Sequence, residues 1–170
     1  MLSQEPSAAV LVLLWGSPPH VLLERKSCSA ASRFACDVAL PGGHIKNGET
    51  PEEAALREAW EEAWVCPSMV RVLGRLGVFS TVSEPKIYTM AILAEPWGPI
   101  DVAPRDPEVD AAFWVNLEHV KKPSTVLHRR RQVQGVKLGK DLVVWGLTLR
   151  ILTSLGEEMA TRSVKDFKGT

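Results

Sequence analysis

The sequence predicts an α/β fold, in which one β-sheet is covered by helices on both faces. Short apolar, β-prone runs recur along the chain, as expected for buried strands. A strong helix start at Thr50 and an amphipathic segment near the C-terminus add two main helices. Strands mixed with two helices are typical of a sheet between helical layers. Because 170 residues suffice for one domain with a substantial core, we predict a single domain over residues 1–170.

The individual elements follow from local signals. Residues 8–15 and 20–26 indicate a hairpin around the turn "GSPP", and residues 27–37 are small and polar, as in a loop. The first helix has Thr50 as its cap, Pro51 in its first turn and Glu53 to complete a capping box, and it ends near residue 64. The other predicted elements are a short strand at 38–43, strands at 69–83 and 87–95, a long loop at 96–110, a strand at 111–117 and a helix at 142–162 with Trp145, Leu149 and Leu152 on one face.

The composition argues against several classes of partner. Lys plus Arg and Asp plus Glu both number 20, so the formal net charge is zero, which disfavours bulk attraction to nucleic acid or to an anionic membrane. No apolar run approaches the ~20 residues of a membrane span, and no basic flank precedes the run at 8–15 as in a signal peptide. Cys28, Cys36 and Cys66 show no CxxC spacing and no Cys/His cluster, so we expect free thiols and a cytoplasmic location.

Three carboxylates crowd one stretch of the first helix. Glu58, Glu61 and Glu62 stand within about one turn, where like charges at i,i+3 and i,i+4 cost roughly 0.2–0.5 kcal/mol per pair. Together with backbone carbonyls of the preceding turn "LPGGHIKNGE" they would supply the oxygen ligands that Mg²⁺ prefers when it joins a protein to substrate phosphates. The alternative is a solvated acidic face, which is the usual outcome for a run of charges.

The spacing around these carboxylates resembles the signature of the Nudix hydrolase family. Gly43, five residues, Glu49, seven residues and then "REAWEEAWV" match the form G-x5-E-x7-R-E-U-x-E-E-x-G-U, in which U is apolar. The resemblance implies a Nudix α/β/α sandwich with a mixed β-sheet between the helices. One position departs, because Trp64 stands where the family has Gly. A Trp enters a left-handed helix cap only with strain, so we expect a different helix end, with Pro67 as the stop.

By this resemblance the chain is an enzyme, a Nudix pyrophosphohydrolase acting on nucleoside diphosphates linked to another group. Glu58, Glu61, Glu62 and the Gly43 carbonyl would bind Mg²⁺ or Mn²⁺. The metal would neutralise diphosphate oxygens and lower the pKa of the attacking water.

The same resemblance assigns two further catalytic roles. Arg57 and Glu49 would pair and hold the loop and the helix in register. The general base stays open between Glu58 and Glu61. Further candidates for the base are two loop acids, Glu84 and Glu108.

A second resemblance concerns the substrate. The stretch "LLERKSCSAASRFACDVALPGG" at 22–43 is similar to the segment that precedes the Nudix signature (the Nudix box) in coenzyme A pyrophosphatases. In this chain Lys26 replaces an Arg of that segment, and Leu40 replaces a Phe. "PEVDAAFWVNL" and "VVWGLTLRIL" resemble two later segments of that subfamily. This implies cleavage of coenzyme A or acyl-coenzyme A to 3′,5′-ADP and (acyl-)4′-phosphopantetheine. The alternatives are hydrolysis of ADP-ribose, nucleoside triphosphates or dinucleoside polyphosphates, and a non-catalytic nucleotide-binding module.

The candidate contacts with substrate are mostly basic. Coenzyme A carries a 3′-phosphate besides its diphosphate, and Arg side chains suit phosphate. The basic run "LHRRRQ" could contact it through Arg129, Arg130 or Arg131, although such runs are usually solvated. The substrate-binding candidates are Arg25, Lys26, Arg33, Gly42, Glu108 and Arg130. We therefore expect a small nucleotide as partner, and a homodimer stays open because apolar surfaces often build dimers in this family.

Overall fold

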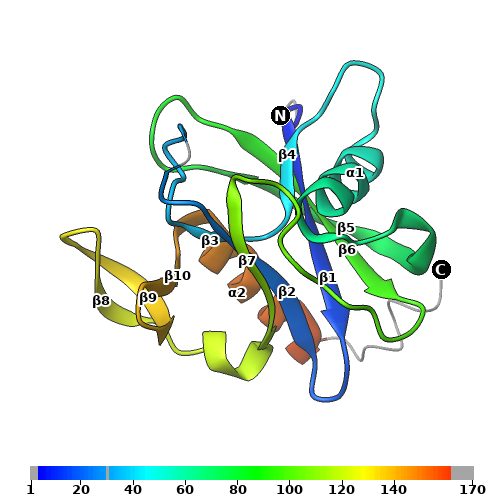
Figure 1. The fold of residues 1–170 in the computed structure, drawn as a ribbon. Helices are drawn as coiled ribbons and strands as arrows, with labels where there is room; N and C mark the ends of the chain where they lie inside the picture. Colours follow the sequence, from blue (N-terminus) through cyan, green and yellow to red (C-terminus); the bar gives the residue numbers. More distant parts are fainter. Residues whose placement is uncertain (1–3, 30, 162–170) are drawn as a thin grey trace.

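The computed structural model describes residues 4–29 and 31–161, which form a mixed β-sheet between two helices and a smaller second sheet (Figure 1). The predicted fold class is confirmed. The helices are α1 (Pro51–Ala63) and α2 (Gly146–Thr161), with 3₁₀ turns at Pro67–Met69 and Leu117–Val120. The strands are β1 (Ala8–Trp15), β2 (His20–Lys26), β3 (Val38–Ala39), β4 (Gly42–His44), β5 (Val70–Ser80), β6 (Tyr88–Pro96), β7 (Val109–Asn116), β8 (Ser124–His128), β9 (Arg131–Gly139) and β10 (Leu142–Trp145). In the described part of the chain, no helix is long and apolar enough to cross a membrane.

The main sheet has seven strands, with β1 running parallel to β6 and antiparallel to β2 and β4. β5 continues the sheet beyond β6, and β7 and β3 pair with β2. Two strands share one edge of β1, because residues Ala8–Val10 pair with β4 whereas Leu14 and Trp15 pair with β2. The sheet therefore opens between β4 and β2, which diverge as they leave β1 (Figure 1).

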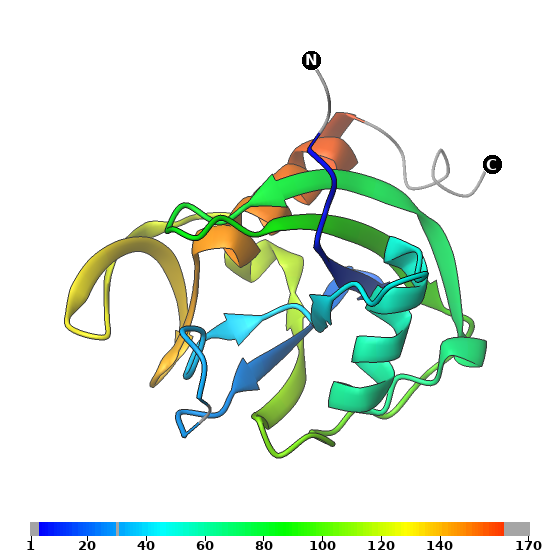
Figure 2. The same cartoon turned by 90° about the horizontal axis from the view of Figure 1, so that it is seen from above.

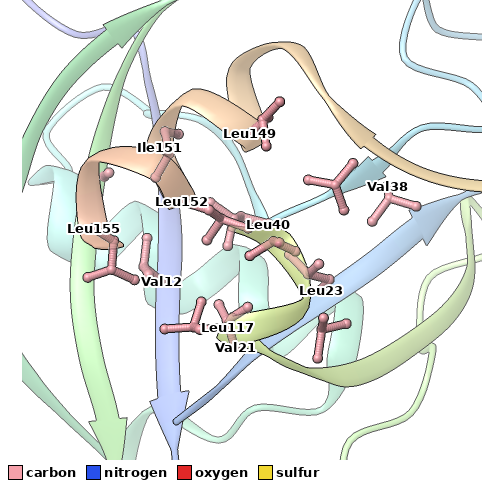
Figure 3. Packing of buried hydrophobic residues seen from close by; sticks show 14 of the residues in the cluster. Val12, Val21, Leu23, Val38, Leu40, Leu117, Leu149, Ile151, Leu152 and Leu155 are labelled. Carbon is pink, nitrogen blue, oxygen red and sulfur yellow. The ribbon is translucent and has the colours of Figure 1, made fainter. Parts of the chain in front are cut away.

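The face of the sheet covered by α2 carries the larger apolar core. Leu149, Leu152 and Leu155 of α2 pack onto Val12 of β1 and Val21 of β2 (Figure 3). Residues three and four apart share one face of a helix, so this stripe follows from the sequence spacing.

The opposite face is covered by α1, which lies close to the sheet because its contact residues are small. Its fully buried apolar residues are Ala54, Ala55, Ala59 and Ala63. The larger side chains of Leu56 and Trp60 are only half-buried.

The two ends of α1 differ in how well the sequence predicts them. Thr50 Oγ1 accepts from the Glu53 N–H at 3.1 Å and the Glu53 carboxylate accepts from the Thr50 N–H at 3.2 Å, so the capping box is confirmed. The helix ends near residue 64 as predicted, but the predicted way of ending is wrong, because Trp64 itself adopts the left-handed cap with φ 61°. The Arg105 guanidinium lies 4.1 Å from the Trp64 ring centre and 4.3 Å from that of Trp60, and this stacking offsets the backbone strain.

Most other predicted elements are confirmed, and the exceptions lie near the C-terminus. β1 and β2 coincide with the predicted residues 8–15 and 20–26. Residues 142–145, predicted as the start of a helix, instead form β10, and Gly146 with φ 58° separates that strand from α2. The sheet order β10-β9-β8 has no counterpart in the predicted elements. Residue 162, the predicted helix end, lies outside the described residues.

Two of the three cysteines form a disulfide, so the prediction of free thiols is wrong for Cys28 and Cys36. Their Cα atoms lie 4.3 Å apart. The Cys36 N–H donates to the Lys26 carbonyl at 3.1 Å, and this hydrogen bond folds the loop back onto the end of β2, which spacing alone does not reveal. Cys66 is free. The cytoplasmic location loses its support from free thiols and stays a prediction.

Candidate active site

A cavity of about 1080 Å³ lies where β4 and β2 diverge. Its walls come from β1 to β4, α1, the turn between β5 and β6, the β8–β9 hairpin and the start of α2. Figure 2 shows these segments from above, with α1 on one side and the hairpin on the other. Cavities of this size are typical of small-molecule sites. Helices from opposite faces of the sheet thus contribute to one cavity.

Arg57 on α1 binds the loop that leads into the helix. Its guanidinium donates to both carboxylate oxygens of Glu49, at 2.7 and 2.9 Å, and to the His44 carbonyl at 3.1 Å. It also donates to Glu58 at 2.8 Å. The hydrogen bonds from Arg57 lower the pKa of Glu49 to about 2, and those same bonds raise the pKa of Arg57. The predicted Glu49–Arg57 pair is present, and it fixes the loop against α1 beside Glu58.

The two glycines of the Pro-Gly-Gly turn are required by close approach. A Cβ atom on Gly42 would overlap the Ala9 carbonyl oxygen of β1, and one on Gly43 would lie 2.6 Å from Glu58 Oε1. The backbone of Gly43 therefore lies directly on the Glu58 carboxylate. Burial raises the pKa of Glu58, and the hydrogen bond from Arg57 opposes this shift.

Glu62 is buried and bound to β2 and the turn. It is 6% exposed, and one oxygen accepts from the Gly42 N–H at 2.9 Å while the other forms an ion pair with Lys26. Lys26 also donates at 2.6 Å to Glu24, which is 0% exposed and whose Oε2 has no hydrogen-bond partner among the described residues. Burial and the neighbouring Glu24 raise the pKa of Glu62 to about 8 despite Lys26. Burial alone would lower the pKa of Lys26, but the two carboxylates outweigh it and raise that pKa.

The three predicted metal-binding carboxylates are not gathered into one cluster. Glu58 and Glu62 line the cavity, whereas Glu61 lies outside it and contacts Arg57 at 3.4 Å. Within residues 4–29 and 31–161, no group of three or more His, Cys, Asp or Glu side chains is placed to hold a metal ion.

The donor set nevertheless fits a hard divalent cation. Glu58 lies beside the backbone of Gly43 and Glu62 beside that of Gly42, and the two carboxylates and the Gly43 carbonyl all offer oxygen ligands. Behind Glu62, Lys26 is one cation shared between the carboxylates of Glu24 and Glu62, and one oxygen of the fully buried Glu24 has no hydrogen-bond partner among the described residues.

Four of the six predicted substrate-binding residues line the cavity, namely Lys26, Arg33, Gly42 and Glu108. Arg33 donates to the backbone carbonyls of residues 84 and 85 at 3.3 and 2.9 Å, so it ties the disulfide loop to the β5–β6 turn. Arg25 and Arg130 are not part of the cavity wall. Arg25 contacts Cys28 Sγ at 3.2 Å, and Arg130 lies at the tip of the β8–β9 hairpin.

Asp37 joins three distant parts of the chain at the far wall, and no sequence pattern singles it out. Its Oδ1 accepts from the Trp145 indole N–H at 3.2 Å and lies 3.1 Å from His128 Nε2 and 3.3 Å from an Arg129 guanidinium nitrogen. Arg129 and Arg131 both line the cavity, in place of the predicted Arg130. A single acidic residue before a strand is too common a feature to predict that Asp37 would join these segments. The run of three arginines does predict that this part of the chain is basic.

Comparison with known proteins identifies the family. The family model described as NUDIX domain matches residues 5–135. An uncharacterized Nudix hydrolase NudL of Pectobacterium atrosepticum is 32% identical over 167 residues, covering 94% of this chain and 85% of that protein. The solved Nudix hydrolase RenU of M. smegmatis matches with a TM-score of 0.64 at 21% identity, covering 94% of this chain and 88% of its own. The NUDIX domain of Shewanella oneidensis NrtR, solved with ADP ribose, matches with a TM-score of 0.60 at 16% identity, covering 93% and 90%. The chain therefore belongs to the Nudix hydrolase family and is a Nudix pyrophosphohydrolase of nucleoside diphosphate derivatives.

Proposed function

We propose that this enzyme hydrolyses the diphosphate linkage of coenzyme A or an acyl-coenzyme A, yielding 3′,5′-ADP and (acyl-)4′-phosphopantetheine. The main support is the arrangement of charges in the cavity. Glu58 and Glu62 lie on its α1 wall, whereas Arg129 and Arg131 come from the hairpin on the other side. Carboxylates suit a metal that binds a diphosphate, and arginines suit a further anionic group of the same substrate.

Mg²⁺ or Mn²⁺ would be held by Glu58 and Glu62 with the Gly43 carbonyl, and Glu61 would join them only if its side chain turned from Arg57 toward the cavity. When bound, the ion would neutralise diphosphate oxygens and acidify the attacking water. Arg57 orients the Glu58 carboxylate through the 2.8 Å hydrogen bond. Glu58 is the first candidate for the general base, because it lines the cavity and Glu61 does not. The loop acids that also line the cavity, Glu84 and Glu108, are the other candidates.

Coenzyme A is favoured by where the subsidiary sequence resemblance falls in the fold. The stretch 22–43 that resembles coenzyme A pyrophosphatases supplies Lys26, Arg33 and Gly42 to the cavity wall. The later resembling segment at 143–152 contains Trp145, which binds Asp37 on the far wall. Both segments therefore meet at the cavity rather than in the apolar core alone.

The test is a substrate panel with Mg²⁺ or Mn²⁺: coenzyme A, ADP-ribose, NADH, dinucleoside polyphosphates and nucleoside triphosphates, with products identified by mass. We expect coenzyme A to have the highest kcat/KM and Glu58→Gln to lower it by about 100-fold or more. Glu118→Gln removes an exposed carboxylate outside the cavity and should leave kcat/KM unchanged. Preferred turnover of another substrate would select the alternative pyrophosphatase. Nucleotide binding without any turnover would select the non-catalytic module and refute hydrolysis.

A further inference from the structure

The cavity continues from the carboxylates of α1 to the N-terminus of α2. Gly146, Leu147 and Thr148 line the same space as Glu58 and Glu62. α2 has 16 residues, and it covers the face of the sheet opposite to α1 (Figure 1). The first N–H groups of a helix lack acceptors within it, and the helix dipole makes that end positive. An anion would therefore be favoured at this end of the cavity.

A buried polar side chain at the same place independently indicates a ligand. Thr148 is 8% exposed and lines the cavity, and its hydroxyl has no hydrogen-bond partner among the residues that the structure describes. The hydroxyl itself reaches the cavity surface, where it can donate one hydrogen bond and accept others. The hydroxyl of Thr148 is thus available to an oxygen atom bound in the cavity.

Two cations complete this end of the cavity. Arg129 is held 3.3 Å from Asp37, which fixes the direction of its side chain and leaves further guanidinium N–H groups free to donate. Arg131 lines the cavity and forms no ion pair with any residue in the described ranges. His128, buried against Asp37 and Trp145, holds the base of the hairpin in place.

From these observations we propose a second anion subsite, formed by the N-terminus of α2, Thr148, Arg129 and Arg131, that binds a phosphate monoester of the substrate. This phosphate is separate from the diphosphate that is cleaved near Glu58. The proposal rests on the proposed function and narrows it to nucleotides that carry an additional phosphate. It also moves phosphate recognition from Arg130 at the hairpin tip to residues that line the cavity.

Binding without metal tests the subsite apart from catalysis. Adenosine 3′,5′-bisphosphate and AMP differ only in one phosphate monoester, and their Kd values can be measured by calorimetry in EDTA. We expect the bisphosphate to bind roughly tenfold or more tightly, as charge-assisted hydrogen bonds imply. Arg131→Gln and Thr148→Val should each reduce this ratio several-fold. Lys137→Gln removes the same charge from an exposed position of β9 outside the cavity and should leave the ratio unchanged.

Three results would refute the subsite. The first is equal affinity for the two nucleotides, and the second is an effect of Lys137→Gln on the affinity ratio as large as that of Arg131→Gln. The third is an affinity ratio that neither Arg131→Gln nor Thr148→Val changes. Thr148→Val keeps the side-chain shape and removes an unpartnered hydroxyl, so it should not lower the melting temperature, and a loss of affinity would then reflect ligand binding. Inorganic phosphate is titrated in parallel. If it binds through Arg131 while the bisphosphate binds no better than AMP, the ligand is free phosphate and the proposal is wrong.

Kinetics separate this proposal from the proposed function. With metal present, kcat/KM for coenzyme A should exceed that for dephospho-coenzyme A, and Arg131→Gln should remove most of the difference. Equal hydrolysis of both substrates would refute the subsite and leave the hydrolase intact. Hydrolysis of neither, with selective binding of the bisphosphate through Arg131, would refute the proposed function and support the subsite.

Discussion

Lys26→Met should destabilise the enzyme, because Lys26 is the cation shared by two buried carboxylates. Glu24 is fully buried and Glu62 nearly so, and both form ion pairs with Lys26. Removing one partner of a buried pair costs about 3–5 kcal/mol, since the remaining charge is left uncompensated. The Lys26 side chain keeps 20% of its exposure, so water can partly replace it, and we expect the lower end, about 3 kcal/mol at pH 7.

The loss of stability caused by Lys26→Met should increase with pH, because of the proton bound by Glu62. Its pKa is raised from 4.5 to about 8, so between these values the folded state holds a proton that the unfolded state lacks. Stability then falls as pH rises, and in the wild type this fall ends near pH 8. Without Lys26 the pKa of Glu62 is higher still, so the variant continues to lose about 1 kcal/mol per pH unit above pH 8.

Urea unfolding in EDTA at pH 7, 8 and 9 measures both effects. Lys26→Arg keeps the positive charge and should cost clearly less than Lys26→Met at every pH. A cost of Lys26→Met below about 1 kcal/mol at pH 7 would mean that water, and not Lys26, compensates the carboxylates. A cost that does not increase between pH 8 and 9 would contradict the role given to the Glu62 proton.

Three further changes test single contacts. Arg57 lowers the pKa of Glu49 to about 2, so the stability that this pair contributes is present above pH 4.5 and is lost as pH falls through 2. In urea unfolding at a series of acidic pH values, the free energy of unfolding of Glu49→Gln should therefore fall less steeply with decreasing pH than that of the wild type. Gly43→Ala would place Cβ 2.6 Å from Glu58 Oε1 and should lower kcat roughly 100-fold in steady-state assays, with little change in melting temperature. Trp64 adopts a left-handed conformation, so Trp64→Ala should be less stable than Trp64→Gly by about 1 kcal/mol in urea unfolding. Both variants lose the contacts of the Trp64 ring, but only alanine keeps the backbone strain. Equal stability of the two variants would contradict that strain.

The parts of the fold that the sequence predicts are those specified by neighbouring residues. The capping box of Thr50 and Glu53 and the hairpin of β1 and β2 depend on groups only a few positions apart. The Glu49–Arg57 pair spans eight positions within the recognised box and was likewise predictable. At Trp64 the same local reasoning fails, because Arg105 from a distant loop supplies the contacts that stabilise the strained cap.

The parts that the sequence does not predict depend on distant partners. In the β8–β9 turn, Arg129 and Arg130 have positive φ values of 49° and 63°. Gly or Asn usually occupies such positions, so a turn without either cannot be predicted from its residues. Asp37 meets His128 and Trp145 across 91 and 108 residues. Such contacts form only once the sheets are assembled, so neighbouring residues in the sequence do not predict the far wall of the cavity. The basic run at 127–132 predicts a positive charge there, but not which arginines line the cavity.

The opening in the main sheet explains why one cavity can join groups from both helices. β2 pairs with β1 only at Leu14 and Trp15; farther along, that edge of β2 pairs with β3, while β7 pairs along the other edge. β4 takes over the vacated edge at Ala8–Val10, where Gly42 allows the backbone to approach β1. The diverging end of β2 carries Lys26, whose side chain forms an ion pair with Glu62 of α1 across the opening. A continuous sheet would separate the α1 face from the α2 face, so the shared edge of β1 is what would let the carboxylates proposed to bind metal and the proposed phosphate subsite at α2 act on one substrate.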